Sequence, residues 1–281
     1  MWISLTQGAA VVWCLLTPLV FIGSIYVKKP PDSLRDDPKE IKRRFLVIGV
    51  TTLLWPLLML FLFSDPGKEG PSPLVWLGLS PFLNCYLGSI ISLALCFCLY
   101  LGPLFQVVFE EPYFFEFDIK AVRALIAAPA YEETVFRVCL IVPMVASGCS
   151  LTLAVVVSSV IFGTSHLYHL VEAFSLKKQK RKQKIHATLV QAAYTTVFGL
   201  YVGYLFVGTG TLFAPVVAHS FCNYMGLPDL SFLTPSSESP YKYRYYIVGA
   251  YLVGILAFAL LLPRMANPSV IKPWLHSFSS T

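Results

Sequence analysis

A series of long apolar runs is the feature that most constrains how this chain folds. The chain has 281 residues, of which 56% are hydrophobic and 13% are charged, whereas a soluble domain averages about 25% charged residues. A bilayer core of roughly 30 Å requires about 20 apolar residues per helix, and several runs reach that length. We therefore expect an all-α fold, a polytopic membrane helical bundle without a large soluble domain.

Hydropathy predicts about eight transmembrane helices along the chain. The expected spans are 4–27, 45–63, 74–101, 121–147, 151–170, 186–207, 211–228 and 244–262. The third is expected to be broken or tilted, because "SPFLNC" interrupts it, and the seventh is short. We interpret 1–281 as a single integral membrane domain with a motif-bearing core at about 105–230.

Basic residues in the short loops predict the orientation of the bundle. The loop 28–44 contains seven Lys and Arg residues and 171–185 contains six, whereas 64–73 contains one and both 148–150 and 208–210 contain none. Loops rich in Lys and Arg stay on the cytosolic side of a membrane. The two basic loops should therefore face the cytosol, and the N-terminus should face the opposite side.

The stretch "AYEETVFRV", 130–138, places charged residues inside the fourth apolar run. A charged residue at the centre of a bilayer costs roughly 2.5–3.5 kcal/mol on translocon scales and is usually functional. Glu133 and Arg137 are four residues apart, so they share a helix face and are expected to pair. Glu132 points about 100° away and is free to act as a general base. The Glu133–Arg137 pair is equally interpretable as an ion pair that fixes helix packing.

Two further polar clusters lie in the fifth and seventh runs. His166 lies in "FGTSHLYH", near the expected cytosolic end of the fifth span, and His169 is a weaker candidate one turn further on. His219 and Asn223 lie four residues apart in "AHSFCNYMGLP", so their side chains project side by side. Two such donors suit the stabilisation of an oxyanion, or they form an interhelical hydrogen-bond pair. The depths of the three clusters predict one shared cavity that opens to the cytosol.

This set of side chains favours hydrolysis by an activated water. Glu132 and His166 would polarise the water, while His219 and Asn223 would hold the developing oxyanion. A zinc site of Glu132, His166 and His219 is a weaker alternative, as is a Cys222 thiolate. A transporter or a non-catalytic scaffold also remains open, although we find no internal repeat of the kind that transporters often show.

The motifs "EETVFR", "FGTSH" and "HSFCNYMGLP" resemble those of the type II CAAX prenyl proteases, the Ras-converting branch of the wider CPBP (ABI) family of intramembrane glutamate proteases. The pattern of that family is Glu-Glu-x-x-x-Arg, Phe-x-x-x-His and His-x-x-x-Asn, and all three parts are complete here in that order. The resemblance is firmest over about 105–230.

The resemblance implies an endopeptidase with eight helices in the endoplasmic reticulum membrane. It implies removal of the C-terminal tripeptide from farnesylated or geranylgeranylated CAAX proteins, such as Ras-type small GTPases, with membrane lipid as surroundings and no nucleic-acid partner. It further implies catalysis without a cofactor by Glu132, His166, His219 and Asn223, with Glu133 and Arg137 in support.

Overall fold

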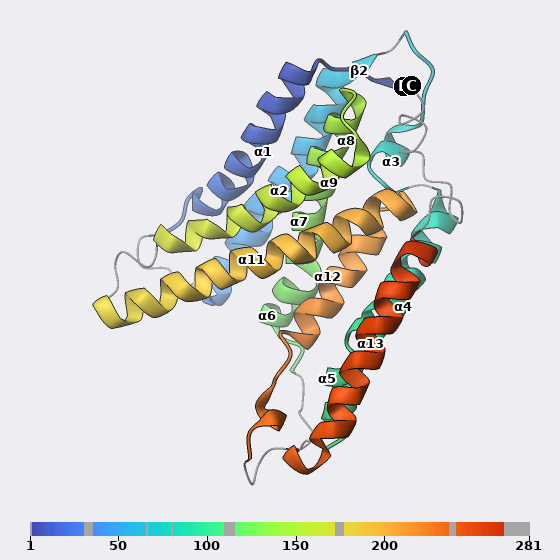
Figure 1. The fold of residues 1–281 in the computed structure, drawn as a ribbon. Helices are drawn as coiled ribbons and strands as arrows, with labels where there is room; N and C mark the ends of the chain where they lie inside the picture. The colour runs from blue at the N-terminus through green and yellow to red at the C-terminus, as the bar shows by residue number, and fades with distance from the viewer. Residues whose placement is uncertain are drawn as a thin grey trace.

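The computed structural model describes residues 2–30, 36–65, 67–79, 81–109, 116–171, 177–235 and 240–266. Its longer helices are α1 (Gln7–Tyr26), α2 (Pro38–Phe63), α4 (Phe82–Leu99), α9 (Leu151–Ser165), α11 (Lys178–Thr209), α12 (Phe213–Met225) and α13 (Arg244–Met265) (Figure 1). Shorter elements are α3 (Pro73–Trp76), α5 (Leu101–Val107) and the 3-10 turns η3 (His166–His169), η4 (Ser231–Leu233) and η5 (Tyr241–Tyr243). Two short strands, β1 (Trp2–Ile3) and β2 (Ser64–Asp65), pair antiparallel.

The expected fourth span is one helical rod made of five consecutive segments, which we call helix four. These are α6 (Ile119–Val122), the π-helical turn η1 (Arg123–Ala127), α7 (Ala128–Glu133), a second π-helical turn η2 (Thr134–Val138) and α8 (Cys139–Ala146). A π turn bonds each carbonyl to the fifth residue onward, and such turns are frequent at functional sites. The two adjacent glutamates of the sequence motif therefore lie between two π turns.

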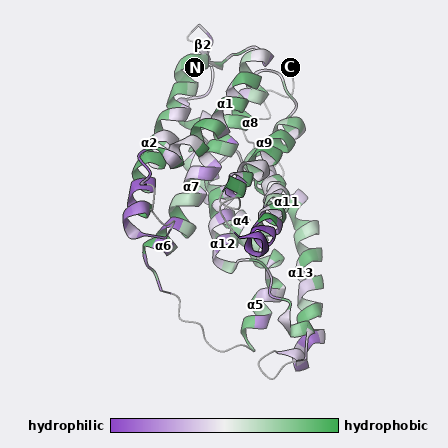
Figure 2. Ribbon diagram, turned by 90° about the vertical axis from the view of Figure 1, so that its left-hand side faces the viewer, coloured by the Kyte–Doolittle hydropathy of each residue, from purple (hydrophilic) through white to green (hydrophobic). Residues whose placement is uncertain are grey.

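The predicted fold class is confirmed, because the described residues form an almost entirely helical chain that is apolar on its outside. Within the described ranges, six helices are long and apolar enough to cross a membrane, namely α1, α2, α4, α9 with η3, α11 and α13 with η5. Large side chains such as Leu19, Phe61 and Leu252 are exposed on the outer surface, as expected where lipid is the solvent. Figure 2 shows hydrophilic residues gathered near the starts of α2, α6 and α11. The α12 helix has only 13 residues, so the count of eight crossings stays a prediction.

Helix boundaries differ from the expected spans where polar turns extend an apolar helix. The α2 helix begins at Pro38 because the Asp37 side chain accepts a hydrogen bond from the Lys39 N–H at 2.7 Å and Pro38 occupies the first turn, which is a favourable helix start. The α11 helix begins at Lys178, within the basic run. Hydropathy detects only the apolar part of each helix. The predicted break in the third span is confirmed, since α3 ends at Trp76 and α4 starts at Phe82.

The α9 and α11 helices pack closely through small residues. A Cβ atom added to Gly163 would lie 1.8 Å from the Thr196 hydroxyl oxygen and 2.6 Å from the Ala192 carbonyl oxygen. On α11, Gly199 faces Ser159 of α9 in the same way. Small residues let membrane helices approach this closely. This contact holds one side of α11 opposite the end of α9, and the cavity described in the next subsection lies on that side.

A proline in α8 creates an attachment point for α1. Pro143 has no N–H to bond the carbonyl of Cys139 four residues earlier. The indole N–H of Trp13 donates to that carbonyl at 2.9 Å, and the Trp13 ring also stacks on Trp55 of α2 with centroids 4.4 Å apart. The N-terminal helices are thereby fixed against the second half of helix four.

Candidate active site

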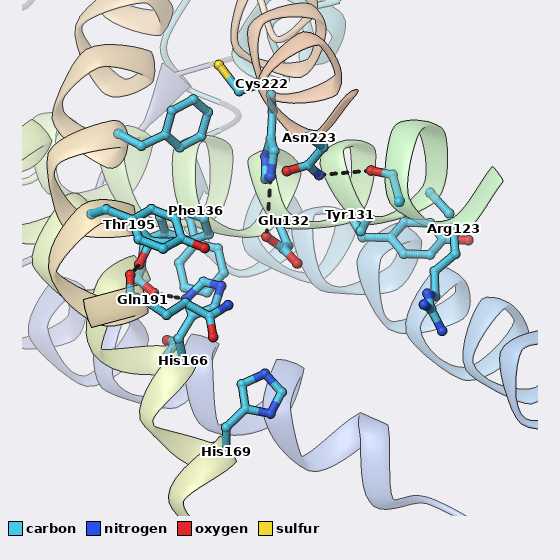
Figure 3. A pocket seen from close by; sticks show the side chains of 18 of the residues that line it. Arg123, Tyr131, Glu132, Phe136, His166, His169, Gln191, Thr195, Cys222 and Asn223 are labelled. Atoms are coloured by element: carbon cyan, nitrogen blue, oxygen red, sulfur yellow. Dashed lines mark hydrogen bonds and ion pairs between the residues drawn. The ribbon is translucent and has the colours of Figure 1, made fainter. Parts of the chain in front are cut away.

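A cavity of about 700 Å³ lies where helix four, the end of α9, α11 and α12 meet, with α1 and α2 closing one side. Its lining includes Glu132, His166, His219 and Asn223, so the predicted convergence of three separate motifs is confirmed. Figure 3 shows Glu132 and Asn223 on one part of the wall and His166 on another, which follows from their positions on different elements. The catalytic roles of these residues stay predictions.

Glu133 and Arg137 lie behind the cavity wall, in the interior of the bundle. Both side chains are fully buried, and the Arg137 Nε donates to Glu133 Oε2 at 2.7 Å, which confirms the predicted pairing. The Arg137 Nη1 donates to Ser158 Oγ at 3.1 Å, and its guanidinium lies 5.1 Å from the centre of the Phe162 ring. The arginine is thus held by an acid, a hydroxyl and an aromatic face.

The second oxygen of Glu133 orients His219, a contact that the sequence spacing does not predict. Glu133 Oε1 lies 2.7 Å from Nδ1 of His219. A carboxylate only accepts hydrogen bonds, so Nδ1 carries a proton and donates it. The Phe198 ring packs edge-on against the imidazole with centroids 5.1 Å apart. The Nε2 atom of the ring is therefore the one that faces Glu132, whose Oε2 lies 3.9 Å away.

Glu132 differs from its neighbour because it lies on the cavity wall. Its side chain is 23% exposed, while that of Glu133 is 0% exposed. Among the described residues, no group donates a hydrogen bond to the Glu132 carboxylate. It is free to accept a proton from a water molecule in the cavity.

His166 presents one defined nitrogen to the cavity. Its Nδ1 lies 3.0 Å from the backbone carbonyl of Phe162. Because a carbonyl only accepts, Nδ1 carries the proton, and the Nε2 of a neutral ring keeps its lone pair. The tautomer that this contact selects suits a group that orients or polarises water.

Asn223 is positioned by a carbonyl that a proline leaves open. In the π turn η1 the Ala128 N–H bonds the carbonyl of Arg123, five residues earlier. By the same pattern, the carbonyl of Ala124 would be bonded by the N–H of the residue at position 129, which is Pro129. Pro129 has no N–H to donate. The Asn223 amide Nδ2 donates to the Ala124 carbonyl instead, at 2.8 Å. One N–H of the amide is thereby fixed, and the other remains available to the cavity.

Pro129→Ala is expected to lower kcat/KM by about 5-fold, because the new N–H competes for the Ala124 carbonyl and one hydrogen bond contributes about 1 kcal/mol. The effect should vanish in an Asn223→Ala background, where no amide remains to be positioned. A double-mutant cycle on substrate turnover measures this coupling. Additive losses would contradict a role of Pro129 through Asn223.

Comparisons with known proteins show which family this chain is similar to. The sequence model of the type II CAAX prenyl endopeptidase Rce1-like family matches residues 92–225. The human CAAX prenyl protease 2 is 32% identical over 274 residues, which cover 92% of this chain and 81% of that protein. The chain belongs to the type II CAAX prenyl endopeptidase family. A probable CAAX prenyl protease 2 of Schizosaccharomyces pombe is 32% identical over 225 residues, 75% of this chain and 78% of that protein. No solved structure matches the chain significantly.

The part of the chain that matches the family model contains all six predicted site residues. The residues that sequence reasoning missed are those that position them, chiefly Ser158, Phe198 and Pro129. A proline inside an otherwise helical run next to a polar motif is the one signal in the sequence that points to such a role. The packing partners Ser158 and Phe198 carry no signal, because serine and phenylalanine are ordinary residues of membrane helices.

The donor set does not favour a metal centre. Within the described parts of the chain, no three His, Cys, Asp or Glu side chains gather into a group that would hold a metal ion. A catalytic zinc site needs three protein ligands at about 2 Å from one point. Glu132, His166 and His219 do not form such a group among the described residues, and the zinc site built from them stays the weaker alternative.

Proposed function

We propose that the protein is a metal-independent intramembrane endopeptidase that releases the C-terminal tripeptide from prenylated CAAX proteins. The observation that carries this proposal is one cavity lined by Glu132, His166, His219 and Asn223 in a chain of the CAAX protease family. The relatives are named CAAX prenyl proteases, and the substrates proposed here are farnesylated or geranylgeranylated proteins, Ras-type small GTPases among them.

In the proposed mechanism, Glu132 removes a proton from a water molecule that His166 Nε2 orients. The water oxygen attacks the carbonyl of the prenylated cysteine, and the carbonyl electrons move onto its oxygen. His219 Nε2–H and the free amide N–H of Asn223 donate to that oxyanion. The oxyanion then collapses, the C–N bond breaks, and the leaving amine takes the proton from Glu132. The products are a prenylcysteine carboxylate and a tripeptide.

This role requires a proton on both nitrogens of His219, since Nδ1 donates to Glu133. The charges in the cluster support such an imidazolium. Glu132 and Glu133 supply two negative charges, and Arg137 with a protonated His219 supplies two positive charges. A charge cluster away from water is stable only when it is paired and hydrogen-bonded.

The rest of the cavity suits a prenyl chain. Much of its lining is apolar and comes from several helices. The apolar lining residues include Phe21, Ile22, Ile25, Ile48, Phe136, Phe198 and Phe258. Burial of each CH₂ group contributes about 0.8 kcal/mol. A prenyl group anchored in the bilayer is therefore expected to enter from the lipid. We propose that the protein lies in the endoplasmic reticulum membrane with this cavity open to the cytosol, as the basic loops predict.

Purified full-length protein in detergent should release the tripeptide from a farnesylated CAAX peptide, and not from the same peptide without its farnesyl group. Mass spectrometry of the products identifies the cleaved bond. Exhaustive chelation should leave the rate unchanged, because no step uses a metal. Absence of tripeptide release would overturn the proposed function, and loss of activity that zinc restores would overturn the metal-independent mechanism alone.

A further inference from the structure

We propose that Arg44 binds the C-terminal carboxylate of the substrate and so selects substrates that end three residues after the cleaved bond. The proposal rests on the proposed function, because an endopeptidase that releases a C-terminal tripeptide must accommodate a free α-carboxylate. That charge needs a partner inside a largely apolar cavity. Arg44 lies on α2 and lines the same cavity as the four predicted catalytic residues.

Arg44 belongs to a cluster of two arginines and one glutamate, which carries a net charge of +1. The Glu40 carboxylate receives two hydrogen bonds from Arg43, from Nε to Oε2 and from Nη2 to Oε1, both 2.7 Å long. Arg44 adds a third through its Nε, also at 2.7 Å. Arg43 is anchored further by the backbone carbonyls of Ile25 and Val27. One carboxylate therefore faces two guanidinium groups, and Arg43 alone neutralises it.

The donors of Arg44 that remain are the ones that bind carboxylates best. Its Nη1 and Nη2 make no hydrogen bond to any residue in the described part of the chain, and its side chain is only 14% exposed. The bond to Glu40 through Nε fixes the plane of the guanidinium. A planar guanidinium with two free N–H groups matches the two oxygens of a carboxylate.

Arg44 also lies within reach of a tripeptide bound at Glu132. The hydroxyl of Tyr131, the residue before Glu132, donates to the carbonyl of Phe45, the residue after Arg44, at 3.3 Å. At this level, the distance between α2 and α7 is therefore about the length of one tyrosine side chain. Three extended residues span about 10 Å, which is the length of chain between the cleaved bond and the terminal carboxylate.

The other arginine of the cavity wall is already neutralised. Arg123 pairs with Asp36 at 2.9 Å, so a substrate anion would have to compete with an existing carboxylate. Arg44 contacts its carboxylate only through Nε, at a Glu40 oxygen that it shares with Arg43, so both of its Nη groups are left for a substrate anion. The surplus charge therefore favours Arg44 as the site of carboxylate binding.

The test compares two farnesylated CAAX peptides that differ only at the C-terminus, one a free carboxylate and the other a carboxamide. The wild-type protein should prefer the carboxylate by about 10- to 100-fold in kcat/KM, the range expected for hydrogen bonds to a charged group. Arg44→Gln should abolish this preference, mainly by raising KM for the carboxylate peptide. Its kcat/KM for the carboxamide should fall far less than that for the carboxylate, and thermal unfolding in detergent reports that the variant is folded. Arg44→Lys should keep part of the preference.

Lys42→Gln provides the matched control. It removes the same charge from an exposed position two residues away that does not line the cavity, so the preference should remain. Equal cleavage of both peptides by the wild-type protein would overturn the role of Arg44 and leave the proposed function standing. Equal losses on both peptides in Arg44→Gln would also overturn it. A wild-type protein that cleaves neither peptide contradicts the proposed function instead.

Discussion

Glu132→Gln is expected to lower kcat for tripeptide release by about 10²- to 10⁴-fold, the usual contribution of a general base. The amide cannot accept the proton of the attacking water. Stability should be unchanged, because the Glu132 carboxylate lies on the cavity wall and is the partly exposed member of the glutamate pair. Glu132→Ala should behave in the same way. The measurements are product release from a farnesylated peptide and thermal unfolding in detergent.

Glu69→Gln is the control for this substitution, since it removes an exposed carboxylate that does not line the cavity. It should retain wild-type activity. If Glu132→Gln kept wild-type turnover, the general base would have to be another group. A variant that lost its folded state together with its activity would instead show that Glu132 supports the structure.

Arg137→Met is expected to destabilise the protein by about 3–5 kcal/mol, the cost of leaving one partner of a buried ion pair uncompensated. Glu133 would keep its charge with only His219 beside it. The double variant Glu133→Leu/Arg137→Met should recover much of this loss, because well-packed apolar residues often replace a buried pair without penalty. Unfolding in detergent with a chemical denaturant measures both changes.

Activity should not recover with stability in the double variant. His219 Nδ1 would have lost the carboxylate that fixes its orientation at 2.7 Å, and the oxyanion donor would no longer be held in place. Recovery of both properties would contradict the positioning role of Glu133. It would leave the ion pair as a packing feature, the alternative that the sequence motif alone leaves open.

The sequence predicted the helices and the polar clusters well because both depend on local patterns. Long apolar runs mark membrane helices, and a spacing of four residues marks a shared face. The pairing of Glu133 with Arg137 followed from that spacing alone. The contact of Glu133 with His219 joins residues 86 positions apart, and no periodicity within either helix contains it.

The π turns of helix four were equally hidden from the sequence. Hydropathy describes 121–147 as one apolar span, whereas η1 and η2 change its hydrogen-bond pattern at two places. The free carbonyl that positions Asn223 depends on one of these turns and on Pro129. Such features follow from the backbone path, and they become visible only when the helix is seen in three dimensions.

The adjacency of Glu132 and Glu133 also determines which kinds of change the site can survive. The side chains of neighbouring residues on a helix point about 100° apart. Here that angle places the Glu132 carboxylate on the cavity wall and the Glu133 carboxylate in the buried interior. Inserting or deleting a single residue close before this pair would rotate each carboxylate into the place of its neighbour or beyond. The number of residues along helix four is therefore under tighter restraint than the identity of its side chains. Residues can be inserted without displacing the two carboxylates only in the loops outside this helix.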